Sequence, residues 1–589
     1  MIRTGNRDMK NKIMLITYSD SFGKNLKELK QMVDTYFKRE INGIHILPFF
    51  PSSGDRGFAP INYREVDPQF GTWEDIQALA ENYELMFDFM INHLSRRSPE
   101  FLDFLEKHDQ SEYADMFLRF KKFWPNGEPD QKQVDMLNKR KPCAPCEDIL
   151  FADGTTEKIW CTFDNEQMDL NLESETAWRF VEKTLRFLMD QGAAMIRLDA
   201  FAFATKKLNT SCFFIEPEMW DMMKRVQGIL DEKNIPMLPE IHDHYTVQQK
   251  IADHGYTVYD FVLPVMVLHT LFSQNSRRLR HWLEICPRDQ HTTLDTHDGL
   301  GTVDVEDLLS EEELQAVIDK TEEYGANFKW DYSQKGHGGK RVYQINCSYY
   351  SAVGEDDDSY LLSRAIQFFT PGVPQVYYMG LLAGENDYEL MERTQYDRNI
   401  SRHNYTVEEI EALVEKPVVK KLCRLMQFRN EYPVFDGEMS LPDTDDSCLS
   451  IVWSRKGLEA RLDARLKELE SLPDSRKKEL QEAARTGMKR TLELASHISV
   501  MNELQRIGNV VSFASIAKDY FGKSKFWIHQ RINGYLVNGK PACFTNEQIV
   551  RMAEALEDIA KQMQETAAHL KVIAAQERST VKKLKTGKE

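Results

Sequence analysis

The sequence predicts a protein of the α/β class whose largest part is a (β/α)8 TIM barrel. Eight short apolar runs have the length and composition of buried strands, and most of them are separated by amphipathic helical segments. This alternation favours a parallel sheet closed into a barrel over an open sheet. Polar residues follow five of the eight runs, at the strand ends where such a barrel carries its catalytic groups. The expected strands are 13–18, 43–50, 85–91, 194–201, 236–241, 258–263, 292–296 and 374–379.

The composition is that of a soluble globular protein of several domains. The chain has 589 residues, 42% hydrophobic and 29% charged, and no run reaches the roughly 18 apolar residues of a membrane span. The N-terminus lacks the apolar core of a signal peptide, and the nine cysteines form no disulfide framework. We therefore expect a cytoplasmic protein with no membrane association. Cys143 and Cys146 form one CxxC pair, which we interpret as incidental thiols rather than zinc ligands.

The net charge of −18 is unevenly distributed along the chain. From Arg461 to the end there are 23 lysines and arginines and 16 acidic residues, a balance of +7. The first 460 residues therefore hold the other 52 basic and 77 acidic residues, a balance of −25. This asymmetry indicates two units with different partners.

The fourth apolar run, AMIRLDA, carries two charges that a buried strand does not tolerate without a reason. Arg197 and Asp199 are two residues apart, so their side chains point to the same side of the strand. One interpretation is an internal ion pair that ties the sheet together. The other is a carboxylate that an arginine keeps ionised and that acts as a nucleophile in a pocket. The run alone admits both.

Polar residues at the ends of the other runs are similar in kind. Taken singly, each has a structural explanation as a cap, a turn aspartate or a core histidine, and that explanation is as good as catalysis. Their recurrence after five runs predicts a common site. They are Asp55 and Phe58 after the second run, Asp88, Asn92 and His93 after the third, Glu240 and His242 after the fifth, and Asp295, His297 and Asp298 after the seventh.

Three of these carboxylates, Asp199, Glu240 and Asp298, have the composition of a site that cleaves glycosidic bonds. Such chemistry with retention needs an ionised carboxylate and a proton-bearing carboxylic acid about 5–5.5 Å apart. A third carboxylate favours the positively charged transition state. Arg197 is expected to keep Asp199 ionised, and Glu240 to protonate the leaving oxygen and later deprotonate the acceptor.

Four motifs, DFMINH, MIRLDAFAFA, LPEIHDHY and LDTHDG, resemble the conserved regions of glycoside hydrolase family 13, the α-amylase family. Longer stretches, among them ITYSDSFGKNLKEL, ILPFFPSSGDRGFAPINY, FFTPGVPQVYY and RNISRHNY, resemble sucrose phosphorylases from about residue 10 to 463. The resemblance implies retaining α-glucosyl transfer, in which phosphate rather than water resolves a glucosyl-enzyme intermediate. It implies no cofactor and no metal, and a monomer or homodimer.

The resemblance also assigns roles to matching positions. Asp199 is then the nucleophile, Glu240 the general acid/base and Asp298 the transition-state stabiliser, with His242 beside Glu240 as a further substrate contact. The other expected sugar contacts are Asp55, Phe58, His93, Gln167, Arg197, His297, Gln344 and Arg402.

Phosphate requires cations or oriented N–H groups. In the motif NKRKPCAP we expect Arg140 to contact phosphate, next to Lys141 and with help from Tyr343. Without the resemblance, this run would be interpreted as a solvated basic loop.

The acceptor side departs from the family pattern. Sucrose phosphorylases commonly have an LDIYQ-like sequence in a mobile loop, where this chain has Lys340, Arg341, Val342, Tyr343 and Gln344. Two added cations fit an anionic leaving group, so sucrose 6F-phosphate is slightly favoured over sucrose as the substrate. A solvent-facing pair of cations, a glucosylglycerate phosphorylase and a sucrose hydrolase or transglucosidase remain as alternatives.

The predicted domains follow from these assignments. The barrel comprises 1–93 and 181–430, an inserted lobe 94–180, a second insertion with the mobile loop 300–345, a partial antiparallel β-domain 431–460 and a helical domain 461–589. Family members finish with a small β-domain, which here is expected to be curtailed.

The end of the chain resembles a small helical bacterial domain of unknown function. Its SIAKDYFGKS–FWIHQRING pattern predicts a helix-turn-helix. A folded interaction module is the preferred interpretation and DNA binding the second, because Phe526, Trp527 and Ile528 could all be core residues. An inactive barrel fused to such a module is the alternative from another class.

Overall fold

The computed structural model describes residues 11–330 and 341–466 and, further on, 500–501, 504, 507–508, 511–533, 536–537 and 540–586. The chain divides into two compact units, Met1–Glu468 and Leu469–Glu589. Within the described residues, no helix has both the length and the apolarity to cross a membrane. Of the predicted helical domain 461–589, residues 461–465 belong to a strand, and residues 467–499 lie outside the described residues.

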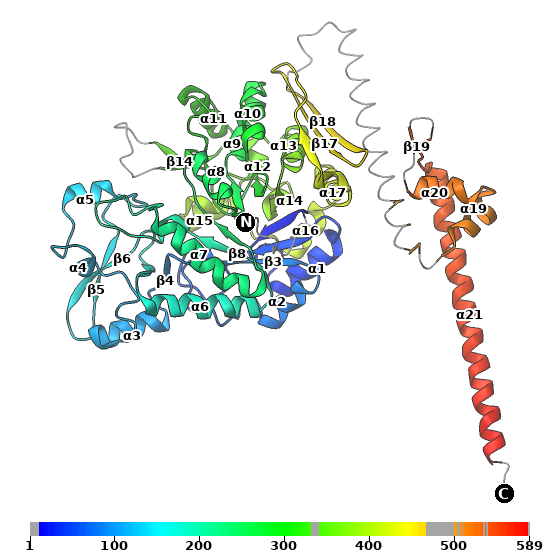
Figure 1. The fold of residues 1–589 in the computed structure, drawn as a ribbon, viewed down its shortest axis with the longest axis horizontal. Coiled ribbons are helices and arrows are strands. Elements are labelled where there is room, and N and C mark those ends of the chain that lie inside the picture. The colour runs from blue at the N-terminus through cyan, green and yellow to red at the C-terminus, as the bar shows by residue number, and fades with distance from the viewer. Residues whose placement is uncertain are drawn as a thin grey trace. The chain divides into compact units, whose positions relative to one another are not determined.

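The first unit is built on an eight-stranded parallel sheet, which confirms the predicted barrel (Figure 1). The strand order is β10-β11-β15-β1-β2-β3-β8-β9, and the end strands β9 and β10 pack against one another. Each predicted run overlaps one of these strands, and β3, β8, β11 and β15 begin one or two residues before the predicted start. Their bounds are β1 Met14–Thr17, β2 Gly43–Ile46, β3 Glu84–Met90, β8 Ala193–Asp199, β9 Met237–Pro239, β10 Val258–Asp260, β11 Gln290–Thr293 and β15 Val373–Tyr377.

The strand register brings the carboxyl ends of the central strands together. Met90 of β3 lies opposite Asp199 of β8, and Leu198 of β8 lies opposite Pro239 of β9. Asp199 and Glu240 therefore leave the sheet side by side. All seven residues of β8 are buried, as expected for a strand covered on both faces.

Helices cover the outside of the barrel because each has an apolar face that the sheet buries. In α6 the buried residues Val181, Leu185 and Leu188 recur at helical spacing. The helices around the barrel are α1 Leu26–Tyr36, α2 Trp73–Ala80, α6 Glu175–Asp190, α7 Glu218–Leu230, α8 Tyr245–Asp253, α9 Leu263–Ser273, α10 Arg277–Ile285, α12 Tyr349–Ala352, α13 Asp357–Phe369, α14 Tyr378–Leu381, α15 Tyr388–Thr394, α16 Val407–Leu413 and α17 Pro417–Glu431.

The inserted lobe follows β3 and contains short helices and two hairpin-like sheets. It ends where α6 begins at Glu175, so the predicted boundary at residue 180 falls inside a barrel helix. Its elements are β4 His93–Ser95, α3 Pro99–Lys107, α4 Phe120–Phe123, α5 Gln131–Met136, β5 Cys146–Leu150, β6 Thr156–Trp160 and β7 Gln167–Asp169. Cys143 and Cys146, at the start of this second sheet, carry free thiols.

One lysine joins the lobe to the barrel. The Nζ of Lys206 lies 2.8 Å from an oxygen of Asp169 and 2.9 Å from Oδ1 of Asn92, and it also contacts the carbonyl oxygen of Phe203. Only 5% of the Lys206 side chain is exposed and Asp169 is fully buried. The lysine thus fixes a positive charge between three oxygens from different segments, where an uncompensated carboxylate would be costly.

The second insertion forms a small antiparallel sheet and one helix. Its elements are β12 Leu300–Gly301, α11 Glu311–Glu323, β13 Asn327–Trp330 and β14 Val342–Asn346. β14 lies between β12 and β13. The predicted mobile loop falls mostly on 331–340, outside the described residues.

A three-stranded antiparallel sheet closes the first unit, with β17 between its neighbours. The strands are β16 Glu438–Ser440, β17 Cys448–Arg455 and β18 Leu458–Arg465. The predicted end of this domain at residue 460 is therefore wrong, because it falls inside β18. The strand continues past residue 460 because buried and exposed side chains alternate along it. Ala460 and Ala464 are buried, while Glu459 and Arg461 are exposed.

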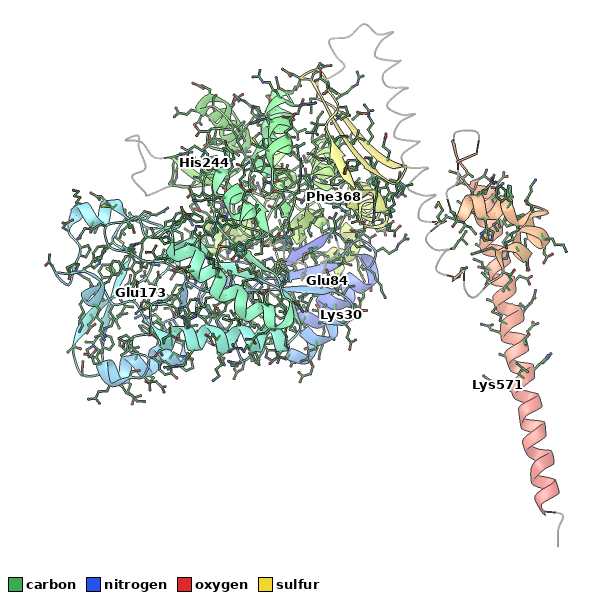
Figure 2. The ribbon with its side chains drawn as sticks, viewed as in Figure 1. Lys30, Glu84, Glu173, His244, Phe368 and Lys571 are labelled. Carbon is green, nitrogen blue, oxygen red and sulfur yellow. The ribbon has the colours of Figure 1, made fainter. Side chains whose placement is uncertain are left out.

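The second unit has its own small core, formed by Leu504, Phe513, Ile516, Ala517, Ile528, Ile532, Phe544, Met552 and Ala555. Its described elements are α19 Phe513–Phe521, α20 Lys525–Ile532, β19 Leu536–Val537, β20 Lys540–Pro541 and α21 Asn546–Thr586. Lys571 stands on the exposed part of α21 (Figure 2). The prediction of a folded helical module is consistent with this core.

Candidate active site

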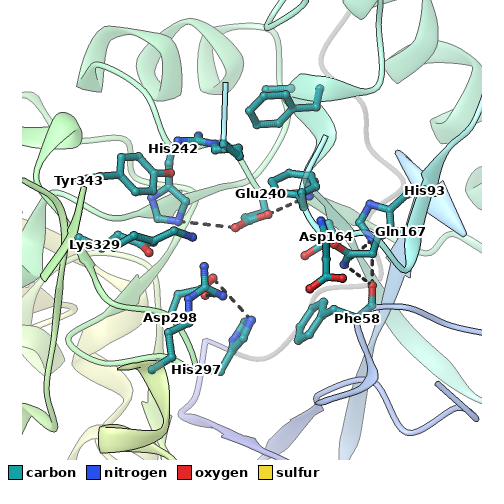
Figure 3. Close-up of a pocket in the computed structure, with 18 of the residues that line it drawn as sticks. Phe58, His93, Asp164, Gln167, Glu240, His242, His297, Asp298, Lys329 and Tyr343 are labelled. Carbon is teal, nitrogen blue, oxygen red and sulfur yellow. Dashed lines mark hydrogen bonds and ion pairs between the residues drawn. The ribbon is translucent and has the colours of Figure 1, made fainter. Parts of the chain in front are cut away.

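A pocket opens at the carboxyl ends of the barrel strands, where β3, β8, β9 and the segment after β11 meet the two insertions (Figure 3). Its volume is about 990 Å³, including space that is open to solvent. The predicted site residues that line it are Phe58, His93, Arg140, Gln167, Asp199, Glu240, His242, His297, Asp298, Tyr343 and Gln344. Residues of the barrel and of both insertions thus converge at this pocket.

Arg197 holds two of the three carboxyl groups at the floor of the pocket. Its Nη1 lies 3.0 Å from Oδ1 of Asp199, and its Nη2 lies 3.4 Å from Oε1 of Glu240. The same Nη1 also contacts Asp88. Glu240 is fixed further, because its Oε2 accepts a hydrogen bond of 2.8 Å from the N–H of Ala200. The two carboxyls are therefore oriented by one guanidinium and one backbone amide.

The expectation that Arg197 simply keeps Asp199 ionised needs correction. Burial and the charge of Glu240 raise the pKa of Asp199 well above its ordinary value, and Arg197 opposes this shift without overcoming it. The reason lies in Asp88. Although burial raises the pKa of Asp88, Arg197 and His45 lower it to about 2, so that Asp88 is the ionised partner that balances Arg197.

Asp199 and Glu240 contact the same guanidinium, and ionisation of Asp199 depends on burial and on the charge of this neighbour. Arg197 lies closer to Asp199 than to Glu240, at 3.0 Å against 3.4 Å. The guanidinium therefore offsets part of the upward shift in the pKa of Asp199.

Asp298 is in a different electrostatic environment. Its Oδ1 lies 2.7 Å from Nη1 of Arg398, and its Oδ2 lies 3.6 Å from Nε2 of His297. Although burial raises it, the charge of Arg398 lowers the pKa of Asp298 well below its ordinary value. The environment of Asp298 therefore favours its ionised form, whereas that of Asp199 disfavours it.

Arg402 acts on the neighbouring residue through the backbone. Its Nε and Nη2 donate hydrogen bonds of 3.1 and 2.9 Å to the carbonyl oxygen of His297. The side chain is fully buried. Arg402 thus fixes the turn that carries His297 and Asp298. Its own side chain does not line the pocket.

Phe58 and His297 form one wall of the pocket. Their rings stack with centroids 4.8 Å apart and an interplanar angle of 5°. The carbonyl oxygen of Phe58 lies 2.8 Å from Nε2 of both His93 and Gln167, which fixes the backbone at this point. Gly57, with φ of 105°, must be glycine, because a Cβ there would lie 2.3 Å from the carbonyl oxygen of Pro48. Burial lowers the pKa of His297 to about 3, so its imidazole is neutral.

His242 lies on the opposite wall, 3.6 Å from Oε1 of Glu240. Its Nδ1 lies 3.3 Å from Oδ2 of the buried Asp304, and its ring stacks on Phe261 at 3.9 Å. Although burial lowers it, the charge of Asp304 raises the pKa of His242. Gly301 makes room for this pair, since a Cβ there would lie 2.1 Å from Oδ2 of Asp304.

Cations gather around Tyr343 on the side of the pocket nearest the two insertions. The guanidinium carbon of Arg140 lies 4.2 Å from the centroid of the Tyr343 ring and 5.0 Å from that of Phe203. The Nζ of Lys329, on β13, lies 6.0 Å from the centroid of Tyr343. Both cations line the pocket, and they favour an anionic group at this side.

Not every predicted residue reaches the pocket. The Nζ of Lys141 lies 2.9 Å from Sγ of Cys161 and 3.9 Å from Glu147, so Lys141 points away from its neighbour Arg140. Arg341 is exposed and lies 3.2 Å from Oε1 of Glu306. Neither residue lines the pocket. Lys340 and the side chain of Asp55 lie outside the described residues.

Several lining residues were not predicted from the sequence. They are Phe163, Asp164, Phe203, Phe213, Lys329, Tyr396 and Arg398. Arg398 is the first residue of RNISRH, the motif from which only Arg402 was predicted. Tyr396 lies just before this motif, after α15. The others come from the two insertions and the loop after β8, whose sequences have no strand pattern from which their positions could be predicted.

Three possible ligand atoms lie close enough to hold a cation. One atom each of Glu240, His242 and Asp298 lies within 4.8 Å of the others. The neighbouring charges of Arg197 and Arg398 already balance these carboxyls. The geometry therefore fits a general acid and a stabilising carboxylate better than a metal site. The expectation that no metal is needed remains a prediction.

The chain is similar to characterised enzymes over most of the first unit. Residues 20–284 match the family model described as alpha amylase, catalytic domain, and residues 500–570 match a domain of unknown function, DUF5053. A sucrose phosphorylase of Streptococcus mutans is 52% identical over 72% of this chain and 89% of its own length. A sucrose 6(F)-phosphate phosphorylase of Thermoanaerobacterium thermosaccharolyticum is 44% identical over 76% and 93%.

Solved structures of related proteins are also similar to this chain. The crystal structure of a sucrose 6F-phosphate phosphorylase from Thermoanaerobacter thermosaccharolyticum has a TM-score of 0.77 and 43% identity, covering 79% of this chain and 96% of that one. An alpha-amylase structure from H. orenii, at 17% identity and a TM-score of 0.57, shares the fold. The similarity extends over 89% to 96% of the length of these sucrose and sucrose 6F-phosphate phosphorylases.

Proposed function

Since the chain belongs to the α-amylase family, glycoside hydrolase family 13, among its sucrose phosphorylases and sucrose 6F-phosphate phosphorylases, we propose that it transfers the α-glucosyl unit of sucrose to inorganic phosphate. The products are α-glucose 1-phosphate and fructose. The observation that carries the proposal is the contact of Arg197 with both Asp199 and Glu240. Transfer with retention requires two neighbouring carboxyl groups, one ionised as the nucleophile and one protonated as the general acid.

In the first step, an oxygen of Asp199 attacks the anomeric carbon as the bond from that carbon to the fructose oxygen breaks. Glu240 gives its proton to the leaving oxygen, so fructose departs as the neutral alcohol. The ring acquires positive charge in the transition state, which the ionised Asp298 stabilises. The product is an ester between glucose and Asp199.

In the second step, a phosphate oxygen attacks the same carbon and displaces Asp199. Glu240, now a carboxylate, takes the proton from the attacking phosphate, and the pair returns to its starting state. Two inversions give net retention. Arg140, held over Tyr343 at 4.2 Å, is positioned to contact the phosphate, and the guanidinium is well suited to that ligand.

We infer fructose, rather than fructose 6-phosphate, as the leaving group. Sucrose 6F-phosphate was slightly favoured because of Lys340 and Arg341, but Arg341 pairs with Glu306 at the surface. The relative with 52% identity is named a sucrose phosphorylase, against 44% for the sucrose 6(F)-phosphate enzyme. Sucrose is therefore our first candidate. Sucrose 6F-phosphate is the second, favoured by the lining cation Lys329.

The decisive experiment incubates the full chain with phosphate and either sucrose or sucrose 6F-phosphate, and measures kcat/KM for release of glucose 1-phosphate. The proposal expects higher catalytic efficiency with sucrose. The reverse order would establish the second candidate. Release of free glucose at a rate independent of phosphate would show a hydrolase instead, and no product from the folded protein would contradict both.

The phosphate contact can be tested separately. Arg140→Ala should raise KM for phosphate while KM for sucrose changes little, because Arg140 lies on the acceptor side. Lys141→Ala is the matched control, since Lys141 is the adjacent cation but contacts Cys161. Equal effects of the two substitutions would argue against a specific role for Arg140.

A further inference from the structure

The segment from Ser512 to Asn533 forms two short helices around a tight turn. α19 ends on Gly522, whose φ of 61° is left-handed. α20 begins after Ser524, whose side chain accepts a hydrogen bond from the N–H of Trp527. The two helices pack together, and α21 packs on α19. Helices joined in this way by a short glycine-containing turn have the helix-turn-helix arrangement, whose second helix enters the DNA major groove.

The second helix has one buried and one open face. Ile528 and Ile532 are buried in the core of the unit. At about 100° per residue, positions 526, 530 and 533 lie on the opposite side of α20. Phe526 is 68% exposed there, so it is not a core residue as the sequence allowed. An exposed ring of this size on a small folded unit indicates a contact surface.

The residues on this open face match the chemistry of base edges. A glutamine such as Gln530 can pair with adenine through two hydrogen bonds, whereas Asn533 follows the end of α20 and its side-chain amide donates a hydrogen bond of 2.9 Å to the carbonyl oxygen of His529. An apolar ring such as Phe526 can contact the methyl group of thymine. Phe526 is a single apolar residue among polar neighbours, whereas a helix that docks on a protein groove presents an apolar stripe.

Charge is segregated within the unit. From Ser512 to Thr545 the sequence has five cations, Lys518, Lys523, Lys525, Arg531 and Lys540, and one acidic residue, Asp519. From Asn546 to Lys571 it has three cations and five acidic residues. Lys518, Lys523 and Lys525 are exposed around the turn. A basic stretch beside the open face of α20, in a chain of net charge −18, fits contacts with phosphate groups.

We propose that the C-terminal unit binds double-stranded DNA, with α20 in the major groove. Phe526 and Gln530 then face base edges, and Lys523 and Lys525 contact the phosphates beside the start of the helix. This activity is separate from the transfer reaction of the barrel, and the two can be measured on the same preparation.

The first test uses the full chain and a fluorescein-labelled random-sequence duplex of about 30 base pairs, followed by anisotropy between about 50 and 200 mM salt. Wild-type protein should bind, and its affinity should fall as salt rises. Lys523→Glu with Lys525→Glu should weaken binding by about tenfold or more and reduce the salt slope by about two. Lys561→Glu with Lys571→Glu, the same charge change on exposed α21, should leave binding nearly unchanged.

The second test concerns sequence reading. Selection from a random duplex pool should enrich a defined site with the wild-type protein, and Phe526→Ala should lose that enrichment while retaining weak, salt-sensitive binding. Circular dichroism and the glucosyl transfer rate should match wild type in all variants. Three results would overturn the proposal: no duplex binding at the lowest salt, equal binding by both charge-reversed proteins, or stronger binding to single strands. The first result would leave a protein as the partner of this surface.

Discussion

Nη1 of Arg398 lies 2.7 Å from Oδ1 of Asp298, and this contact sets the charge of the carboxylate proposed to stabilise the transition state. Four residues later, Arg402 donates two hydrogen bonds to the carbonyl oxygen of His297. Two arginines of one motif therefore hold two consecutive residues, one through its side chain and one through its backbone. The positions of His297 and Asp298 at the pocket therefore depend on both arginines.

Arg398→Gln should make activity more sensitive to acid. Arg398 is the largest charge that opposes the effect of burial, so without it the pKa of Asp298 rises and the acidic limb of the pH profile of kcat/KM should move to higher pH. We expect kcat/KM at neutral pH to fall by about 10²-fold. Arg393→Gln, on the exposed α15, is the control. An unchanged acidic limb would show that Arg398 does not control Asp298.

Asp199→Asn should abolish transfer without unfolding the protein. An amide cannot form the glucosyl ester, so kcat should fall by about 10⁴-fold or more. Because burial and Glu240 raise the pKa of Asp199, removing its charge should leave Tm at pH 7 equal or higher. Asp190→Asn, an exposed residue paired with Lys233, controls for the substitution. Residual activity within tenfold of wild type would refute the assignment of the nucleophile.

Lys206→Ala should destabilise the junction between the lobe and the barrel. The substitution leaves the buried carboxylate of Asp169 without its cation, and losing one member of a buried pair costs about 3–5 kcal/mol. Thermal unfolding should show a clearly lower Tm. The neighbouring Lys207 forms an exposed pair with Glu218, so Lys207→Ala should have little effect. Equal Tm values for the two variants would contradict this account.

His291 should make the protein less stable as the pH falls. Burial lowers its pKa to about 3 in the folded state, whereas an unfolded histidine titrates near 6.5. Between these values the unfolded state binds more protons, so folding stability declines with falling pH by up to about 1.4 kcal/mol per pH unit. Tm of His291→Gln should depend less steeply on pH between about 6.5 and 4 than Tm of the wild type. Parallel curves would contradict the assignment.

Removing metal ions should leave the reaction unchanged. Glu240, His242 and Asp298 resemble a ligand set, but Arg197 and Arg398 already supply positive charge to the carboxyls. Dialysis against EDTA should therefore not alter kcat/KM. If activity were lost and a divalent cation restored it, the carboxyls would have to be reassigned as ligands.

The sequence predicted the barrel well because its strands are buried on both faces. Runs such as MLIT and AAMIRLD are short and apolar. Strands that alternate with helices along the chain form parallel sheets, and few topologies satisfy the connection rules for such sheets. The three carboxylates were predicted because strand ends converge at one face. Asp295 shows the limit of that argument, since it also ends a strand but forms a buried pair with Arg364 at 2.6 Å. Periodicity alone does not separate such a pair from a catalytic group.

Residue type did not separate side chains whose direction is set by tertiary contacts. Arg140 and Lys141 are adjacent and were both predicted at the phosphate side, but one faces Tyr343 and the other Cys161. Arg398 lies in a motif from which only Arg402 was predicted. Both members of each pair are cations of similar reach, so the sequence does not distinguish them. The electrostatic role of Asp88 was missed because it depends on the contact with Arg197, which spacing along the chain does not reveal.

Arg197 contacts Asp88, Asp199 and Glu240, and this arrangement has a consequence for the proposed reaction. When glucose forms an ester with Asp199, that carboxyl loses its charge, but Glu240 becomes a carboxylate in the same step. The negative charge therefore passes from one neighbour of the guanidinium to the other. Because Arg197 contacts both carboxyls, the same guanidinium can balance the charge in both steps of the proposed transfer, and no additional cation has to enter with phosphate.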